Sequence, residues 1–250
     1  FAMNNDAYDP HYFFKLAIKS GLSAYAAPLG MLEAGADKYA GTIPTILKLN
    51  SSNSLSGKEA PDQAITGSVK DALRLGCSAV GMTIYPGSPK AIDMIEEASE
   101  IIAEAKSHGL ASVVWSYPRG GILSKEGETA IDVCSYAAHI AALLGAHIIK
   151  VKPPTPHLEL PEAQKIYEQE KIKIDVLSDR IRDVVRSCFN GKRIVVFSGG
   201  GAKSVSDLIE EVEAIKKGGG NGSIIGRNSF QRPFEESVLL LKAICNIYKS

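Results

Sequence analysis

The sequence predicts an α/β fold with a parallel sheet, in the form of a (βα)8 barrel. Short apolar runs alternate with longer amphipathic stretches along the whole chain. Several of the runs consist almost entirely of β-branched or small apolar residues, which is typical of parallel strands covered on both faces. Repeated strand–helix units favour a parallel sheet with right-handed crossovers.

The elements can be placed in order along the chain. The expected strands are residues 23–29, 45–50, 78–87, 110–120, 146–154, 193–201 and 222–228. The expected helices are residues 9–21, 62–76, 88–109, 130–145, 173–188, 204–219 and 233–249. The first of these helices opens with an Asp cap and a proline and ends in glycine, which are the usual start and stop signals.

The expected strands are one fewer than a closed barrel needs. A barrel of this type has eight strands, and because the chain begins with a helix we expect its first strand to precede Phe1. A doubly wound open sheet is the alternative, but no GxGxxG follows the first visible strand to build a dinucleotide site. We expect one barrel domain over residues 1–250, with an insertion at about 153–177 over the mouth.

Charge and cysteine usage exclude several classes of protein. The 28 basic and 28 acidic residues cancel, so there is no basic excess of the kind that nucleic-acid binding needs. The four cysteines form no CxxC pair, which favours free thiols in a reducing compartment. No apolar run is long enough to cross a membrane and no signal-peptide pattern is present. We therefore expect a cytoplasmic protein without nucleic-acid or membrane partners.

Glycine-rich segments end the last two expected strands. They are SGGG, with Ser198, Gly199 and Gly200, and GRN, with Gly226 and Arg227. Glycine lets backbone N–H groups approach an oxyanion, and Arg can fork onto phosphate oxygens. Phosphate sites of barrels lie after strands seven and eight, so these loops predict a phosphate site. The alternative is that the glycines only form tight turns.

Two lysines end the strand at 146–154. Lys150 and Lys152 share a face because a strand alternates with period two. Burial or a neighbouring cation lowers the pKa of a lysine and gives a neutral amine that attacks carbonyl groups. One lysine could form a Schiff base while the other lowers its pKa; the alternative is a pair of lysines that extend into solvent.

Aromatic residues end the preceding strand. Tyr117 can give and take a proton, and Trp115 can pack on a substrate, although both could be core aromatics. Lys48 ends an earlier strand of the same sheet. No His is paired with Cys, Asp or Glu at metal-ligand spacing, so no metal is expected.

At these residues the sequence resembles a known family. The segments GAHIIKVK, VVWSYPRGG, FSGGGAKS and GGGNGSIIGRNSFQR are similar, in this order, to class I fructose-1,6-bisphosphate aldolases of the archaeal and bacterial DhnA (DeoC/FbaB-like) type. The resemblance runs from about residue 10 to residue 248. It implies a (βα)8 barrel, a phosphorylated sugar substrate, a homo-oligomer and Schiff-base chemistry without a metal or other cofactor.

The resemblance also implies roles for single residues. It selects Lys150, not Lys152, as the nucleophile, and Tyr117 as the proton donor beside Trp115. Lys152 and Lys48 would keep the amine neutral and compensate phosphate charge. The phosphate would bind to the set of loop residues Ser198, Gly199, Gly200, Gly226 and Arg227.

One departure from the family and two alternative functions stay open. The family carries an Asp on its first strand, and no matching motif is present here; we expect it in a segment before Phe1. One alternative is a related lysine-dependent aldolase or transaldolase-like enzyme for another phosphorylated or deoxy sugar. The other is a non-catalytic barrel that binds phosphosugars.

Overall fold

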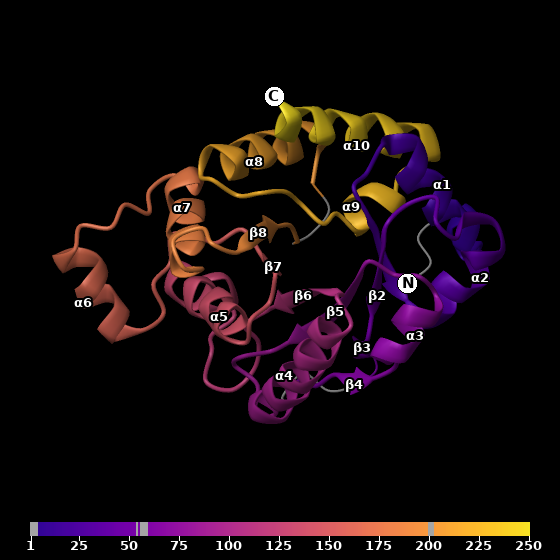
Figure 1. Cartoon of the computed structure of the whole chain (residues 1–250). Helices are drawn as coiled ribbons and strands as arrows, with labels where there is room; N and C mark the ends of the chain where they lie inside the picture. Colours follow the sequence, from indigo (N-terminus) through magenta and orange to yellow (C-terminus); the bar gives the residue numbers. More distant parts are fainter. Residues whose placement is uncertain (1–4, 54, 56–59, 200–202) are drawn as a thin grey trace.

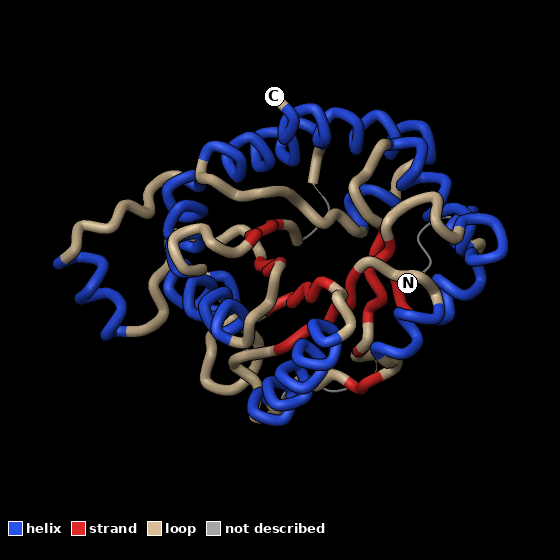
Figure 2. The backbone as a smooth tube through the Cα atoms, viewed as in Figure 1, coloured by secondary structure: helices blue, strands red, loops and turns tan. Residues whose placement is uncertain are grey.

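In the part of the chain that the structure describes, six parallel strands form the central sheet. The structure is a computed structural model that describes residues 5–53, 55, 60–199 and 203–250. The strands are hydrogen-bonded in the order β1-β2-β5-β6-β7-β8, and the helices surround them (Figures 1 and 2). Their bounds are β1 Tyr25–Pro28, β2 Thr45–Lys48, β5 Ala79–Ile84, β6 Ala111–Ser116, β7 Ile148–Val151 and β8 Ile194–Phe197.

The helices follow the expected order with three additions, α2, α6 and α9. Their bounds are α1 Pro10–Ser20, α2 Leu29–Tyr39, α3 Val69–Arg74, α4 Ala91–Ser107, α5 Ile131–Leu143, α6 Pro161–Gln169, α7 Leu177–Ser187, α8 Val205–Lys217, α9 Arg227–Phe230 and α10 Phe234–Lys249. Short 3-10 turns cover Asn5–Tyr8 and Gly127–Thr129. In the described part of the chain, no helix combines the length and the apolar character that crossing a membrane requires.

Helix α1 shows how local sequence sets the bounds of an element. The side chain of Asp9 accepts a hydrogen bond from the backbone N–H of His11 at 2.9 Å, and Pro10 occupies the first helical position. Such a cap contributes about 1 kcal/mol. The helix ends at Gly21, whose φ of +69° is left-handed and suits glycine. The expected helix at 9–21 is confirmed.

Alternate residues of the strands point to two different apolar layers. One cluster inside the curve of the sheet contains Ile46, Val113 and Trp115. The larger cluster contains their neighbours in sequence, such as Leu47 and Val114, packed under the surrounding helices. Because a strand alternates with period two, the side chains at 48 and 150 belong to the inner layer.

The first and last helices pack against each other. Tyr12 and Leu16 of α1 are buried in one cluster with Val238 and Leu241 of α10. Lys19 of α1 also donates a hydrogen bond to Glu235 at 2.6 Å, and Figure 1 shows the two helices side by side. This contact joins α1, which precedes the edge strand β1, to α10, which packs against α8, the helix that follows the other edge strand, β8.

The strand expected at 222–228 is not formed. The segment makes one parallel bridge, between Val196 and Gly222, with the N–H of Phe197 donating to the Gly222 carbonyl at 3.0 Å. Helix α9 then begins at Arg227. A ladder needs continuous pairing, and among the described residues only β8 pairs with this segment, so the strand is reduced to a single bridge.

The helix expected at 62–76 is wrong in its first half. Ala64–Ile65 form the short strand β4, which pairs antiparallel with β3 at Asn50–Ser51. Helix α3 starts only at Val69, where Ser68 and Asp71 form a capping box. The S-x-x-D pattern at 68–71 signals this start in the sequence.

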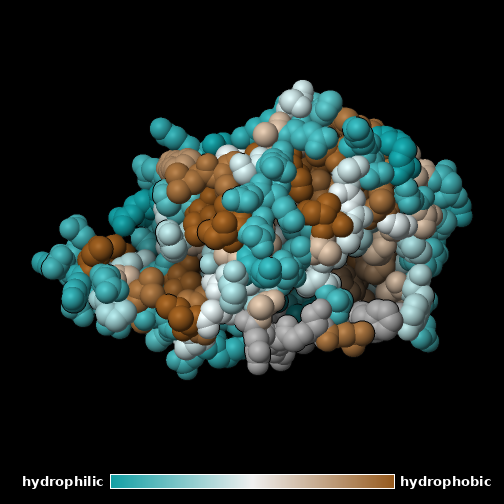
Figure 3. Space-filling model, turned by 90° about the horizontal axis from the view of Figure 1, so that it is seen from below, coloured by the Kyte–Doolittle hydropathy of each residue, from teal (hydrophilic) through white to brown (hydrophobic). Residues whose placement is uncertain are grey.

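The segment 153–177 contains helix α6, which projects from the body of the protein (Figures 1 and 3). None of the residues of α6 is buried. Two buried carboxylates hold α6 and the residues just before it to the body. Asp132 accepts hydrogen bonds from the N–H groups of Glu159 and Leu160, and Asp183 accepts one from the Tyr167 hydroxyl at 2.5 Å.

Candidate active site

Lys150 lies in the middle of the inner layer. It stands on β7 in register with Trp115 of β6 and with Val196 of β8, and its exposed fraction is 7%. Burial lowers the pKa of its amine from 10.5 to about 7, because a charged ammonium loses hydration there. Near neutral pH a large share of Lys150 is therefore an uncharged amine with a free electron pair.

Tyr117 faces this amine from the end of β6. The Lys150 Nζ lies 5.9 Å from the centre of the Tyr117 ring. The N–H of Tyr117 donates to the Ile84 carbonyl at 3.0 Å, which continues the strand pairing. Burial raises the pKa of the phenol, and the charge of Arg119 acts in the opposite direction. The phenol is thus a protonated group that can donate.

Arg119 is a site residue that the sequence reasoning did not single out. Its guanidinium lies 5.2 Å from the ring centre of Tyr85 and 5.9 Å from that of Tyr117. Tyr85 is held in turn by Gln63, which donates to the Tyr85 hydroxyl at 2.6 Å. The signal was present in the YPRGG segment, where a cation follows Tyr117 by two residues.

Lys152 has a different environment from Lys150. Its Nζ lies 3.8 Å from a carboxylate oxygen of Glu128. Burial and then the charge of Arg119 lower its pKa, while Glu128 raises it. The lowered pKa of Lys150 has burial as its cause, so the neighbouring-cation role expected of Lys152 for this shift is not found.

Lys48 is a second amine of the inner layer. Its Nζ donates to the Asn50 carbonyl at 2.5 Å and to the Asn50 side-chain oxygen at 2.6 Å. The Asn50 side chain is itself fixed to β5, since it donates to the Thr83 carbonyl and accepts from the Thr83 N–H. Lys48 also lies 5.8 Å from the Trp115 ring centre, and burial lowers its pKa from 10.5 to about 7.

Gly81 explains how the Trp115 ring fits into the inner layer. A Cβ atom at position 81 would lie 2.5 Å from Cζ3 of the indole, which is a clash. The ring therefore occupies the space that any other residue at 81 would fill. A glycine inside a buried strand marks a close approach of this kind, and the AVGMTI run carried that signal.

The two glycine loops lie next to each other. The Ser198 hydroxyl donates to the Ile224 carbonyl at 2.5 Å, and the N–H of Lys203 donates to the Asn228 side-chain oxygen at 3.0 Å. The contact of Ser198 is therefore with Ile224, two residues before Gly226, which precedes α9. The Arg227 side chain is exposed. Gly200 lies outside the described residues.

Gly199 connects this loop pair with the lysine strand. Its φ is +137°, and a Cβ atom there would lie 3.3 Å from Cγ of Lys152. The loops therefore adjoin Lys152, whereas Lys150, Tyr117, Trp115 and Lys48 form a group around the inner layer. The two groups are connected through Lys150 and Lys152, which lie two residues apart at the end of β7.

A latch joins the 153–177 segment to the loop after β6. The Glu159 carboxylate accepts from the Ser124 N–H at 2.7 Å and from the Ser124 hydroxyl at 2.8 Å. His157 lies 2.8 Å from the same carboxylate. These hydrogen bonds, led by the one from the Ser124 N–H, lower the pKa of Glu159. The loop that follows Tyr117 and Arg119 is thereby tied to the segment that follows Lys152.

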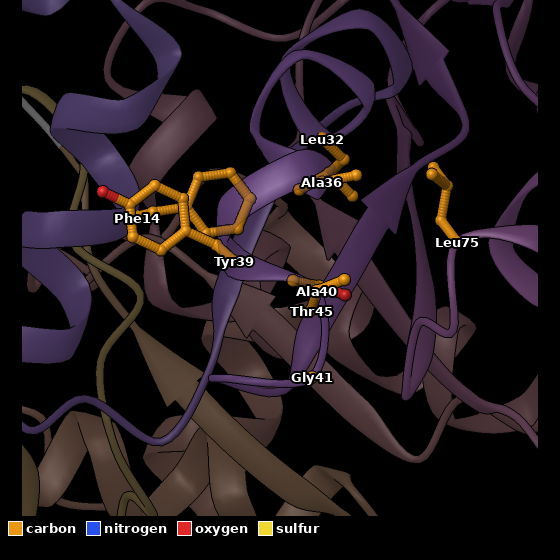
Figure 4. A pocket seen from close by; sticks show the side chains of 8 residues that line it. All are labelled: Phe14, Leu32, Ala36, Tyr39, Ala40, Gly41, Thr45 and Leu75. Carbon is orange, nitrogen blue, oxygen red and sulfur yellow. The ribbon is translucent and has the colours of Figure 1, made fainter.

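A small cavity lies at the other end of the strands. It has a volume of about 20 Å³ and is lined by Phe14, Leu32, Ala36, Tyr39, Ala40, Gly41, Thr45 and Leu75 (Figure 4). The rings of Phe14 and Tyr39 are stacked at 5.0 Å. Thr45 begins β2 whereas Lys48 ends it, so this cavity is separate from the lysine site. Among the described residues, no cluster of three or more His, Cys, Asp or Glu could hold a metal ion.

The fold and the site together define a class of protein, the parallel α/β barrels with a lysine-centred site at the carboxyl ends of the strands. The family model described as "DeoC/LacD family aldolase" matches residues 2–232. The chain belongs to this family of aldolases.

Individual relatives agree with this assignment. "Fructose-bisphosphate aldolase class 1" of Thermoproteus tenax is 36% identical over 93% of this chain and 78% of its own length. "Probable fructose-bisphosphate aldolase class 1" of Chlamydia muridarum is 37% identical over 99% of this chain and 74% of its own length.

A solved structure confirms the fold class. The chain is 33% identical to an archaeal fructose-1,6-bisphosphate aldolase whose catalytic Lys is covalently bound to the carbinolamine intermediate of the substrate. The TM-score is 0.82, and the match covers 100% of this chain and 88% of the other. The predicted α/β barrel class is therefore confirmed.

Proposed function

We propose that this protein is a class I aldolase that reversibly cleaves fructose 1,6-bisphosphate to dihydroxyacetone phosphate and glyceraldehyde 3-phosphate. The observation that carries the proposal is the Lys150 amine, which is buried, has a pKa of about 7 and lies beside the Tyr117 phenol. The names of the relatives from Thermoproteus tenax and Chlamydia muridarum support the choice of substrate.

In the first half of the reaction Lys150 acts as the nucleophile. Its electron pair attacks C2 of the ketose and forms a carbinolamine. Tyr117 gives a proton to the departing hydroxyl group, water leaves, and an iminium ion remains. Breaking the C3–C4 bond sends its electron pair into the iminium, while the C4 hydroxyl gives its proton to the Tyr117 phenolate and becomes the aldehyde. Glyceraldehyde 3-phosphate departs and an enamine stays on Lys150.

In the second half the enamine is protonated and hydrolysed. Tyr117 returns a proton to C3, and water then releases dihydroxyacetone phosphate and the free amine. All electrons of the broken bond end in the new C–H bond, so no oxidant is needed. Because the iminium ion takes up these electrons during cleavage, no metal or other cofactor is expected. Trp115 lines the space in which these steps occur.

Two cationic regions suit the two phosphate groups. The loop pair around Ser198, Gly199 and Gly226, with Arg227 next to it, suits one phosphate. Arg119, beside the rings of Tyr85 and Tyr117, provides the second region. Lys152 adds charge next to Gly199, and the charge of Arg119 lowers the pKa of Lys152. A bound phosphate would offset this repulsion.

The same proposal extends to the setting of the enzyme. We expect one barrel domain with the 153–177 segment near the active-site mouth, a cytoplasmic location and a homo-oligomer. The latch between Glu159 and Ser124 supports the placement of the segment, because Ser124 belongs to the loop that follows Arg119.

Borohydride trapping tests the mechanism. Reduction in the presence of fructose 1,6-bisphosphate should add mass to the peptide that contains Lys150, and a Lys150→Met variant should gain none. Lys152→Met is the matched control, because it removes a lysine two residues away and should still be trapped at Lys150. EDTA should leave activity unchanged. Absence of an adduct on Lys150 would refute the mechanism, and trapping only with another sugar phosphate would favour the related-aldolase alternative.

A further inference from the structure

The inner layer holds a second lysine whose contacts lead to Trp115. Lys48 reaches the indole from β2, on a different strand from Lys150. Its Nζ is fixed by two oxygens of Asn50, and Asn50 is only 3% exposed. Because Asn50 is bound in turn to Thr83 of β5, the amine cannot move independently of the sheet.

The indole is enclosed on three sides. Lys48 lies 5.8 Å from its ring centre, Gly81 leaves the space that the ring fills, and Lys150 is its register neighbour on β7. A lysine cation at such a distance attracts the face of a tryptophan ring, and the attraction is stronger where water is excluded. Lys48 thus contributes a directional contact, while Gly81 contributes only room.

We propose that Lys48 is a positioning residue, which holds the Trp115 indole in the orientation that packs beside Lys150. This role differs from that of a phosphate ligand, because the Lys48 amine is directed to Asn50 and the indole. The inference rests on the proposed function only for its effect on the reaction. The orientation of the ring exists without substrate and can be measured without turnover.

The composition of the chain makes the measurement direct. Trp115 is the only tryptophan among the 250 residues. Fluorescence excited at the long-wavelength edge of tryptophan absorption, where tyrosine does not absorb, therefore reports on this ring alone. Lys48→Met keeps the length of the side chain and removes the amine. Lys70→Met, on the exposed side of α3, is the matched control.

In the Lys48→Met variant we expect a shifted emission maximum and at least a twofold rise in quenching by acrylamide. We also expect kcat to fall by about tenfold, because a misplaced group beside the reacting atoms reduces the rate strongly. Lys70→Met should match the unmodified protein in all three measurements. Unchanged emission and quenching in Lys48→Met would overturn the proposal, and so would changed emission with an unchanged kcat.

The pH dependence of the emission separates positioning from simple packing. The other titratable or charged groups on the strands beside the ring are Lys150 on β7 and Tyr117 at the end of β6, with Arg119 next to Tyr117. Of these, Lys150 also has a pKa of about 7. We expect a change of emission between pH 6 and pH 9 that is kept in Lys150→Met and lost in Lys48→Met. The reverse pattern would overturn the assignment to Lys48.

Two more variants keep the test decisive if Lys48→Met does not fold. Lys48→Arg retains a cation at every pH, so its emission should resemble that of the unmodified protein at low pH and should not titrate. Gly81→Ala should displace the indole from the other side, whereas Gly30→Ala, with open space around it, should not. An emission that still titrates in Lys48→Arg would refute the role. Borohydride trapping at Lys150 tests the aldolase mechanism separately.

Discussion

The Lys150 amine should lower the stability of the protein near neutral pH. The perturbation is Lys150→Met, which replaces the amine by an apolar group of similar length. The pKa of Lys150 falls from 10.5 to about 7 on burial, so between these two values the unfolded chain binds more protons than the folded one. Stability then rises with pH over this window. Below about pH 7 the full destabilisation is present.

The size of the effect follows from the two pKa values. At pH 7 Lys150 should lower the free energy of unfolding by about 4 kcal/mol, since a difference of one pKa unit between the folded and unfolded states corresponds to about 1.4 kcal/mol. At pH 9 the same difference should be about 2 kcal/mol. Lys150→Met should therefore be inactive and yet more stable than the unmodified protein, with an advantage that narrows by about 2 kcal/mol from pH 7 to pH 9.

Urea unfolding at a series of pH values measures this difference. Other titrating groups, Lys48 among them, affect both proteins alike and cancel when the two are compared at each pH. Lys70→Met is the control, because the exposed Lys70 should give a difference that does not depend on pH. A constant difference between Lys150→Met and the unmodified protein from pH 7 to pH 9 would refute the reasoning.

Two further predictions concern other parts of the molecule. Glu159→Ala removes the acceptor of both Ser124 hydrogen bonds, so amide hydrogen exchange in residues 120–129 should become faster. Glu162→Ala, at an exposed position, is the control and should leave this exchange unchanged. Equal exchange rates in the two variants would contradict the role of Glu159 in holding the loop. Burial raises the pKa of Cys134 to about 12 and that of Cys188 to about 11, so at pH 8 iodoacetamide should modify the partly exposed Cys245 first. Mass spectrometry measures which cysteine is modified. Rapid modification of Cys134 in the folded protein would show that burial does not protect its thiol.

Periodicity and caps were sufficient for most of the fold. Helix α1 carries its own boundaries, from Asp9 to Gly21, and the parallel strands are apolar on both faces because both layers are buried. The segment 222–228 was misjudged for a physical reason. Its composition suits a strand, but a strand also needs neighbours on the sheet, and that information is not local.

The candidate site was predicted in part. The lysine end of β7 and the aromatic end of β6 were visible in the sequence, because polar groups stand out at the ends of apolar runs. The sequence left two causes open for a lowered pKa of Lys150, burial and a neighbouring cation. Burial depends on the residues at the same level of neighbouring strands, such as Trp115 and Val196, and these are not known from the sequence. Arg119 and Gly81 were missed because each acts through a ring that belongs to another residue.

The position of Lys150 in the register of the sheet has a consequence for folding. Its two neighbours in sequence, Ile149 and Val151, are fully buried in the outer layer with the alanines of α5. If β7 paired with β6 one residue out of step, Ile149 and Val151 would fit inside the barrel, but the lysine would enter that dry layer of alanines. The apolar residues alone tolerate this error, and the lysine does not. Lys150 therefore selects against a misaligned sheet before any substrate is present.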